Sequence, residues 1–448
     1  MFPGPHVMAR RACAFSGWRD GTVRGQAAGL GHCAGLASAR YYLRLRRDVS
    51  GQPHRGRALK LLLIKAMADG HLYSHFAGAL RQALADLGHD ATVSDQSAHV
   101  ADGAAQTAPL VAELQSARPD AVVSFSSFFG GLTLGNGVSL FDALGVKFIG
   151  WQLDHPIYAP QSLKPELQGR YAIYANRNHL RYAQAVKLPG RGITLLPGGE
   201  APPAPVKDYR SRDWPIFVAA TWNGVPQRLW EQTQDSPGKH LLMGVVDALL
   251  RDRNASLLDA FNATSAKLKL GARLGDDPAF DATMRGFLCE PLTYVRNIDR
   301  INILRALVEA GLPLTICGAG WQELFGDRKN VTYLERVDFR DLQAMYGNAR
   351  VVLNLNAGNG AGERAVYAAL AGAAVASDYS EQLDSLLGGG QGVAFFNRAR
   401  PDTAAQVVGG LIESGKGEAL AQRGHDKAVR SGLWRHRAQQ LVEFVQGP

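Results

Sequence analysis

The chain has 448 residues, of which 46% are hydrophobic and 20% are charged, and this length is too great for one core and suits two domains. Its formal net charge of +9 arises at the start: residues 1–57 contain ten Arg against Asp20 and Asp48, whereas the remainder has 39 basic and 38 acidic residues. The body is electrically balanced, so no basic face for binding nucleic acid is implied.

The first 57 residues differ from the rest of the chain. They are rich in Arg and Gly, poor in acids, and lack the apolar run of a secretory signal. Three origins are open: a transit-like presequence, a disordered basic arm, or upstream sequence included by a wrongly assigned start codon. We favour the last, and expect the folded protein to begin near residue 58.

Cysteine usage and hydropathy favour a reducing compartment. The four cysteines have neither a paired framework nor metal-ligand spacing; they are Cys13, Cys33, Cys289 and Cys317. No stretch approaches about 18 uninterrupted apolar residues, so no transmembrane helix is predicted. We therefore expect a cytoplasmic protein.

From residue 58 onward, short apolar strands alternate with helices, which is typical of a parallel α/β sheet. The first series of strands is predicted at 58–64, 91–95, 120–126, 146–153, 171–176 and 193–199, with helices at about 73–87 and before Pro119. The second series is predicted at 214–221, 312–318, 331–335, 351–357, 373–377 and 392–396. A proline-rich linker at 197–209 separates them.

This alternation predicts an α/β protein with two Rossmann-like, doubly wound domains that face a cleft. The first domain is expected at 58–200 and the second at 210–428, with a helical insertion at 226–310. A closing helix at 429–448 is expected to cross back to the first domain. Ligands of such sheets bind beyond the carboxyl ends of the strands, so each domain should supply one wall of the site.

The segment 351–378 predicts a phosphate site. A buried strand leads into a glycine-rich turn and a helix, which directs free N–H groups and the positive end of a helix dipole at one point. We expect the turn to bind through Asn356, Gly360 and Gly362, with Arg364 gripping a diphosphate. An ordinary strand–loop–helix connection is the alternative.

Two more loops of the second domain carry candidate ligand groups. Gly318 and Gly320 would let the backbone approach a ligand closely, and Trp321 offers a flat face for a base or sugar. Trp321 could instead cap the helix behind it. After the strand at 214–221, Asn223 and Arg228 could contact a diphosphate leaving group, unless Arg228 is a solvated surface residue.

The first domain offers candidate general bases. Gly70 and His71 follow its first strand, and Asp154 and His155 follow the strand at 146–153. Carboxylates and imidazoles at strand ends suit removal of a proton from an acceptor hydroxyl. In a chain with twelve His, a structural role for His155 is the alternative.

Four stretches in the same order resemble the group 1 glycosyltransferases of GT-B fold, and specifically the spore-maturation-protein-like branch. They are GVKFIGWQLDHP at 145–156, LTICGAGW at 314–321, GERAVYAALAGAAVASD at 362–378 and LWRHRAQQLVEFV at 433–445. Arg364, Gly372 and Asp378 match the branch's signature. The resemblance covers nearly all of residues 58–445.

The resemblance implies transfer of a sugar from a nucleotide-diphosphate donor to a hydroxyl of an unidentified acceptor, which could be a glycan, a protein or a small molecule. It implies a donor site that includes Glu363, Arg364 and Asp378. No Asp-x-Asp motif stands at a strand end, which agrees with a metal-independent reaction that needs no cofactor. A nucleotide-sugar epimerase and a non-catalytic binding protein of the same fold are the alternatives.

The chain departs from the family at Tyr367, where a Glu expected to bind the nucleotide ribose usually stands. A phenol can form one such hydrogen bond, but it cannot accept two as a carboxylate can. We expect Tyr367 to lie over the ribose. The substitution is also the main support for the non-catalytic alternative.

Overall fold

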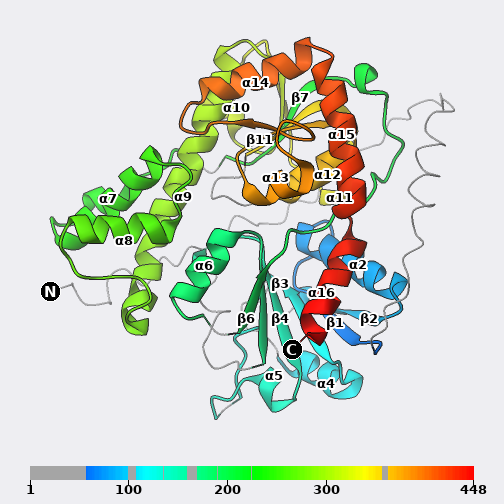
Figure 1. Ribbon diagram of the computed structural model, residues 1–448, viewed down its shortest axis with the longest axis vertical. Helices are drawn as coiled ribbons and strands as arrows, with labels where there is room; N and C mark the ends of the chain where they lie inside the picture. The colour runs from blue at the N-terminus through cyan, green and yellow to red at the C-terminus, as the bar shows by residue number, and fades with distance from the viewer. Residues whose placement is uncertain are drawn as a thin grey trace. The chain divides into compact units, whose positions relative to one another are not determined.

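Two six-stranded parallel sheets organise the computed structural model (Figure 1). The structure describes residues 57–98, 107–134, 136–158, 169–188, 190–222, 224–355 and 362–447. Both sheets belong to one compact unit of the chain, residues 53–448. Apart from Arg57, the predicted N-terminal arm lies outside the described residues.

The first sheet has the strand order β2-β1-β3-β4-β5-β6, and all of its pairings are parallel. Its strands are β1 Lys60–Lys65, β2 Asp90–Asp95, β3 Ala121–Phe125, β4 Lys147–Gln152, β5 Arg170–Tyr174 and β6 Arg191–Thr194. The order reverses between β1 and β3. In open α/β sheets, ligands bind beyond the carboxyl ends of the strands at such a reversal.

The second sheet has the order β12-β11-β10-β7-β8-β9, again with parallel pairings throughout. Its strands are β7 Trp214–Ala219, β8 Leu314–Cys317, β9 Val331–Leu334, β10 Ala349–Asn354, β11 Ala374–Asp378 and β12 Ala394–Phe396. This order reverses between β7 and β10. The loop that leads from β10 to residue 363 therefore begins at the reversal point.

Helices connect the strands of both sheets. In the first lobe they are α2 Leu72–Asp86, α4 Thr107–Ala117, α5 Leu140–Ala143, the 3₁₀ turn η1 Pro156–Tyr158 and α6 Arg177–Ala185. In the second lobe they are α10 Trp321–Phe325, α11 Phe339–Tyr346, α12 Glu363–Leu370, α13 Glu381–Leu387, α14 Asp402–Glu413 and α15 Lys416–Ser431. None of the described helices combines the length and the apolar character that crossing a bilayer requires.

The structure confirms the α/β class, the two Rossmann-like lobes and all twelve predicted strands, with ends that differ by a few residues. The central strands could be predicted from near-continuous apolar runs, because parallel strands are buried on both faces. The last helix, α16 Trp434–Gln446, lies against α2 of the first lobe (Figure 1). Lys147 of β4 donates a hydrogen bond to the Val445 carbonyl of α16 at 3.0 Å.

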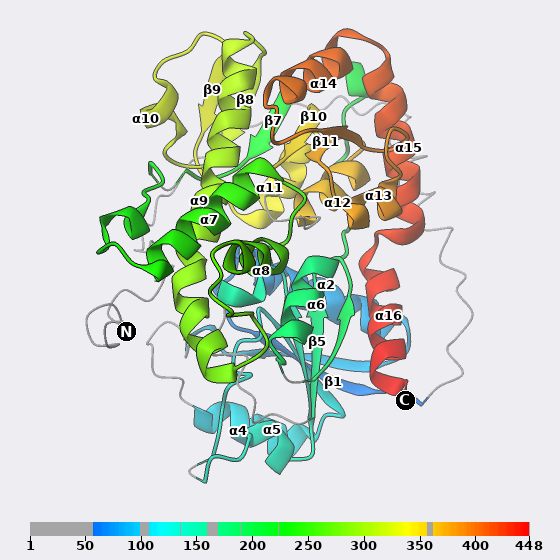
Figure 2. The ribbon, with the colours of Figure 1, turned by 60° about the vertical axis from the view of Figure 1, so that its left-hand side comes forward.

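Three helices are inserted between β7 and β8: α7 Pro237–Arg251, α8 Leu257–Lys267 and α9 Pro278–Glu309, which lie side by side in Figure 2. Their apolar side chains form one core with residues of the first lobe, namely Ile157, Tyr182 and Val186. The Cys289 thiol of α9 also lies 3.3 Å from the Ile157 carbonyl. The helical insertion is therefore packed against η1 and α6 of the first lobe.

An aromatic cluster joins α16 to both sheets. Trp434, which is 3% exposed, has Phe76 of α2, Phe125 of β3 and Trp151 of β4 within 4.9 to 6.0 Å between ring centroids. Its indole N–H donates to the hydroxyl of Tyr367 in α12 at 3.0 Å. These rings fix the point at which the last helix passes from one lobe to the other.

We expect Trp434→Ala to destabilise the protein by about 3–5 kcal/mol, because it empties the centre of this cluster and removes a hydrogen bond to the Tyr367 hydroxyl. Urea unfolding followed by fluorescence or circular dichroism measures the loss. Tyr379→Ala is the matched control, since Tyr379 is 47% exposed and should change stability by no more than about 0.5 kcal/mol. Equal effects of the two substitutions would contradict this assignment.

Candidate active site

Three arginines and two carboxylates lie in one electrostatic neighbourhood next to the strand ends. Arg296 and Arg300 are four residues apart on α9 and so share a helix face, and Arg364 lies in the first turn of α12. The pKa of Arg300 is lowered to about 9, first by burial and then by the charges of Arg296 and Arg364. Asp154 and Glu363 oppose this lowering.

The ion pairs within the cluster are long. A terminal guanidinium nitrogen of Arg296 is 3.6 Å from the Asp154 carboxylate, and the Nε of Arg364 is 3.8 Å from the Glu363 carboxylate. The buried Nε atoms of Arg296 and Arg300 have no hydrogen-bond partner among the described residues. Because native proteins rarely leave buried donors unpaired, this is a point at which an anion would be stabilised.

The carboxyl end of β3 and the start of α2 contribute two hydroxyls to the same neighbourhood. Burial raises the pKa of Tyr73, and the Asp154 charge raises it further, while a hydrogen bond with Ser126 lowers it. The charges of Glu363 and Arg296 also act on Tyr73. These residues follow β1 and β3, so the reversal point of the first sheet adjoins the arginine cluster.

The turn after β3 is strained. Ser126 and Ser127 have φ of 57° and 55°, a left-handed conformation that non-glycine residues seldom adopt. Two buried partners hold it, since Gln152 and Arg170 both donate to the Ser127 hydroxyl. Strain of this kind persists where the surroundings over-determine the backbone, and it is commonly found at functional sites.

Asp154 is the predicted base that the structure brings to this cluster, and its side chain is 52% exposed. His155 points elsewhere: its ring contacts His179 and Tyr182 at centroid distances of 4.9 and 4.7 Å, and its Nδ1 accepts from the Ile157 amide. Burial holds the pKa of His155 well below 6.5. This position supports the structural alternative for His155.

His71 caps α2, because its Nδ1 accepts a hydrogen bond from the Tyr73 amide at 3.1 Å. Burial, assisted by the charge of Arg336, lowers the pKa of His71 to about 4, so its imidazole is neutral at pH 7. The neighbouring Gly70 has φ of 83°, and its carbonyl accepts from the Phe339 amide at the start of α11. Both residues thus hold the local backbone and the contact between lobes.

The glycines of the loop after β8 approach another loop closely. A Cβ on Gly318 would lie 2.0 Å from the Ala220 carbonyl oxygen, and one on Gly320 would lie 2.8 Å from the Trp222 carbonyl. Trp321 is 1% exposed, and its indole N–H donates to the Ala220 carbonyl. The expectation of a free Trp face for a ligand is therefore wrong: Trp321 starts α10 and packs in the core.

Tyr367 also lies in the core rather than over a ribose. Its side chain is 2% exposed, it packs edge-to-face with Phe339, and its hydroxyl accepts from Trp434. The sequence suggested a ligand contact because the family that the chain resembles usually carries a ribose-binding Glu at this position. Long-range packing against α16, which the local pattern cannot reveal, gives the phenol its partner instead.

Arg228 is held by neighbours of its own. Its Nε donates to the Tyr294 hydroxyl at 2.8 Å, and a terminal nitrogen pairs with Glu231 at 2.9 Å. The predicted residues Asn223, Asn356 and Gly360 lie outside the described part of the chain, whereas Gly362 is the N-cap of α12.

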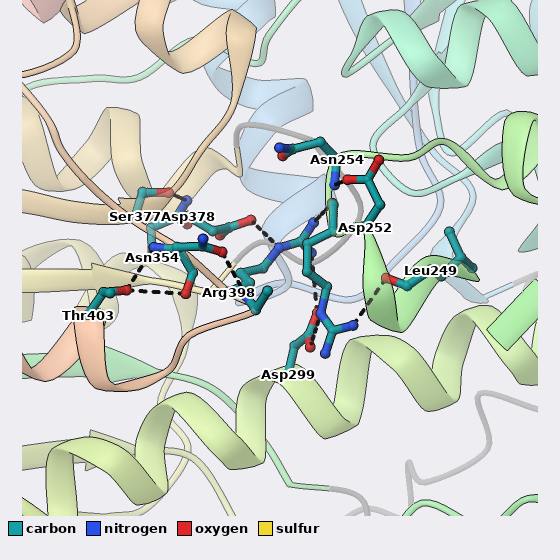
Figure 3. Close-up of polar contacts among 12 residues, drawn as sticks. Leu249, Asp252, Asn254, Asp299, Asn354, Ser377, Asp378, Arg398 and Thr403 are labelled. Atoms are coloured by element: carbon teal, nitrogen blue, oxygen red, sulfur yellow. Dashed lines mark hydrogen bonds and ion pairs between the residues drawn. The ribbon is translucent and has the colours of Figure 1, made fainter. Parts of the chain in front are cut away.

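Asp378 belongs to a buried network of four charges at the carboxyl end of β11 (Figure 3). Arg398 lies 3.3 Å from Asp378 and 3.5 Å from Asp299 of α9, and Arg253 donates to Asp299 at 2.8 Å. Asp299 is 1% exposed. The network ties α9 to the second sheet, and Asp299 lies between Arg296 and Arg300 in the sequence.

Sequence reasoning missed Arg296, Arg300, Tyr73 and Ser126. One signal was present in VRNIDR at 295–300, where two Arg at helical spacing lie within a largely apolar helix. Their closeness to Asp154 depends on the packing of α9 against η1. Spacing along the chain carries no information about that contact.

The C-terminal part of the chain matches a known family. Residues 297–443, which include Arg300, Glu363 and Arg364, match the family model described as glycosyl transferase-like. Together with the two parallel sheets, the match supports a glycosyltransferase of the GT-B type.

The solved structures with a similar backbone arrangement include three of low sequence identity. Sucrose-phosphate synthase from Thermosynechococcus elongatus is 10% identical, with a TM-score of 0.49 over 87% of this chain and 98% of that chain. A glycosyltransferase from Rickettsia africae ESF-5 is 10% identical, with a TM-score of 0.47 over 87% and 98%. Anabaena Alr3699/HepE in complex with UDP-glucose is 10% identical, with a TM-score of 0.46 over 87% and 100%. These scores add nothing to what the sheets themselves show, and no curated protein matches the sequence significantly.

The position of Tyr367 predicts that Tyr367→Phe lowers stability rather than ligand affinity. The indole N–H of buried Trp434 would lose its acceptor, at a cost of about 1–3 kcal/mol in the free energy of unfolding. Calorimetric titration with nucleoside diphosphates should give the same dissociation constant as the parent. Tyr379→Phe, at an exposed ring, is the control for stability. If Tyr367→Phe instead weakened nucleotide binding and left stability unchanged, Tyr367 would have to be assigned to the ligand site.

The buried pair His155 and His179 predicts a loss of stability in acid. Burial lowers the pKa of His179 to about 3. Below pH 6.5 this imidazole is therefore protonated in the unfolded chain but stays neutral in the folded protein. The contribution is intact above pH 6.5 and is lost as the pH falls, at up to about 1.4 kcal/mol per pH unit for each such group. Urea unfolding at pH 7, 6 and 5 should show a shallower pH dependence for His179→Asn than for the parent. Identical slopes would contradict the assignment.

Proposed function

We propose that the chain is a glycosyltransferase that moves a sugar from a nucleoside-diphosphate sugar to a hydroxyl of an acceptor, without a metal ion or a further cofactor. The observation that carries the proposal is the cluster of Arg296, Arg300 and Arg364, in which two buried guanidinium Nε atoms have no partner among the described residues. The family match over residues 297–443 supports the same reaction class.

The charges of the cluster favour a polyanionic ligand. Among the described residues, Asp154 and Glu363 are the carboxylates that oppose the three guanidinium groups, and both ion pairs exceed 3.5 Å. Desolvated cations are costly unless they are paired, and planar guanidinium groups bind phosphate oxygens bidentately. A diphosphate supplies the missing negative charge. Neutral glycans or simple alcohols do not.

The proposed reaction uses these groups in two roles. As the bond between the sugar and the diphosphate breaks, negative charge grows on the leaving oxygen, and Arg300 and Arg364 are placed to stabilise it. Asp154, on the first-lobe side of the cluster and half exposed, accepts the proton of the acceptor hydroxyl. Tyr73, hydrogen-bonded to Ser126, lies near enough to help position that hydroxyl.

A different carboxylate takes the place of the Glu that the family carries at position 367. Glu363 is four residues earlier on α12, so it lies on the same helix face one turn closer to the N-terminus. Its side chain is 18% exposed. We assign the ribose hydroxyls to Glu363, which leaves Tyr367 to its structural role.

The reaction class is tested by incubating the protein with UDP-, GDP-, ADP- and TDP-sugars, with and without candidate acceptors. Release of nucleoside diphosphate together with a new glycoside supports the transferase. Conversion of one nucleotide sugar into its epimer without an acceptor would establish the epimerase alternative instead. Tight binding of nucleotide without any turnover would establish the non-catalytic alternative.

We expect Arg300→Ala and Arg364→Ala each to weaken nucleoside-diphosphate binding by about 1.5–3 kcal/mol, the range for hydrogen bonds to charged groups, which is about 10- to 150-fold in the dissociation constant. Isothermal titration calorimetry with UDP, GDP, ADP and TDP measures the effect. Arg305→Ala is the matched control, because Arg305 is an exposed arginine on the same helix. Affinities that match those of the control would remove the cluster from the donor site.

A further inference from the structure

We infer that donor binding displaces Asp154 from Arg296, so that the acceptor base loses its arginine partner when the diphosphate occupies the arginine cluster. The inference rests on the proposed function. It adds a coupling between the two ligand sites: one arginine serves the carboxylate before the donor binds and the diphosphate afterwards. Arg296 acts in this scheme as a positioning residue.

The first support is the weakness of the existing pair. The Arg296 nitrogen and the Asp154 oxygen are 3.6 Å apart, beyond the 2.7–3.2 Å of a good hydrogen bond, and Asp154 is 52% exposed. Long, partly exposed pairs of this kind contribute little to stability. A diphosphate oxygen that meets the guanidinium directly forms a stronger, charge-assisted contact and therefore wins the exchange.

The second support is the unused capacity of Arg296. Its side chain is only 21% exposed, and its buried Nε has no hydrogen-bond partner among the described residues, although one terminal nitrogen faces Asp154. A guanidinium offers parallel donors that match two oxygens of a phosphate. The pair with Asp154 thus leaves a donor unsatisfied that a phosphate can engage.

The third support is that the backbone on both sides of the pair is held by other contacts. The turn η1, two residues after Asp154, packs on α9, since the Cys289 thiol reaches the Ile157 carbonyl at 3.3 Å and Thr293 donates to the Tyr158 hydroxyl at 3.2 Å. Breaking the pair therefore moves side chains without separating η1 from α9. Asp154 stays beside the cluster and half exposed, so its carboxylate can receive the acceptor's proton.

A double-mutant cycle tests the exchange, with UDP, GDP, ADP and TDP titrated separately into the parent, Asp154→Asn, Arg296→Ala and the double variant. We expect Asp154→Asn to tighten binding of the preferred diphosphate by up to about fivefold, the equivalent of about 1 kcal/mol, because Arg296 no longer has a competitor. In the Arg296→Ala background the same substitution should have a markedly smaller effect.

A second cycle between Asp154 and Arg364 is the matched control for simple charge removal. Loss of one negative charge near a phosphate tightens binding whichever arginine is present, so coupling that is equal in the two cycles would overturn the exchange. At saturating nucleotide sugar, Asp154→Asn should also slow donor hydrolysis or transfer while it tightens binding. Unchanged turnover would overturn the release of a base.

The two proposals fail in different ways. If the parent binds none of the four diphosphates, the proposed function is wrong. If the parent binds one of them and the Asp154–Arg296 cycle shows no coupling, the exchange is wrong and the donor site stands. Circular dichroism spectra and melting temperatures of all variants verify that each is folded.

Discussion

A buried carboxylate, Asp299, is the charge on which the position of the arginine cluster depends. It lies at 1% exposure between Arg253 and Arg398, and Arg398 also meets Asp378 at the end of β11. Burial raises the pKa of Asp299, while the two arginines oppose the shift by favouring its charged form. Because a buried charge is tolerated only with its partners in place, α9 is held to the second sheet at this residue.

The same helix is held on its other side by the first lobe. Ile157, Tyr182 and Val186 share a core with the three inserted helices, so α9 is a structural bridge as well as part of the insertion. Arg296 and Arg300 flank Asp299 on α9. They come a few residues after Thr293, which contacts η1 through the Tyr158 hydroxyl. An insertion that looks peripheral in the sequence thus supplies two of the three cations of the candidate site.

Tyr367 illustrates how one position can change its role while the fold persists. A carboxylate there would face Phe76, Phe339 and the indole of Trp434, and burying a charge among these rings is costly. A tyrosine adds ring contacts and one hydrogen bond at the same place. Tyr367 thereby contributes to the packing between the lobes, and Glu363, one helical turn away, is the nearest carboxylate on that helix face.

The sequence by itself determined the two parallel sheets, because their central strands are near-continuous apolar runs and most strands are followed by a helix before the next begins. It also offered Asp154, Glu363 and Arg364 as candidates, because they stand directly at strand and helix ends. Tertiary structure alone decided that Arg296 pairs with Asp154, that Trp321 and Tyr367 are buried, and that His155 turns toward His179. The physical reason is that periodicity records which residues are buried within an element, whereas the partner of a polar group is set by packing between elements far apart in the chain.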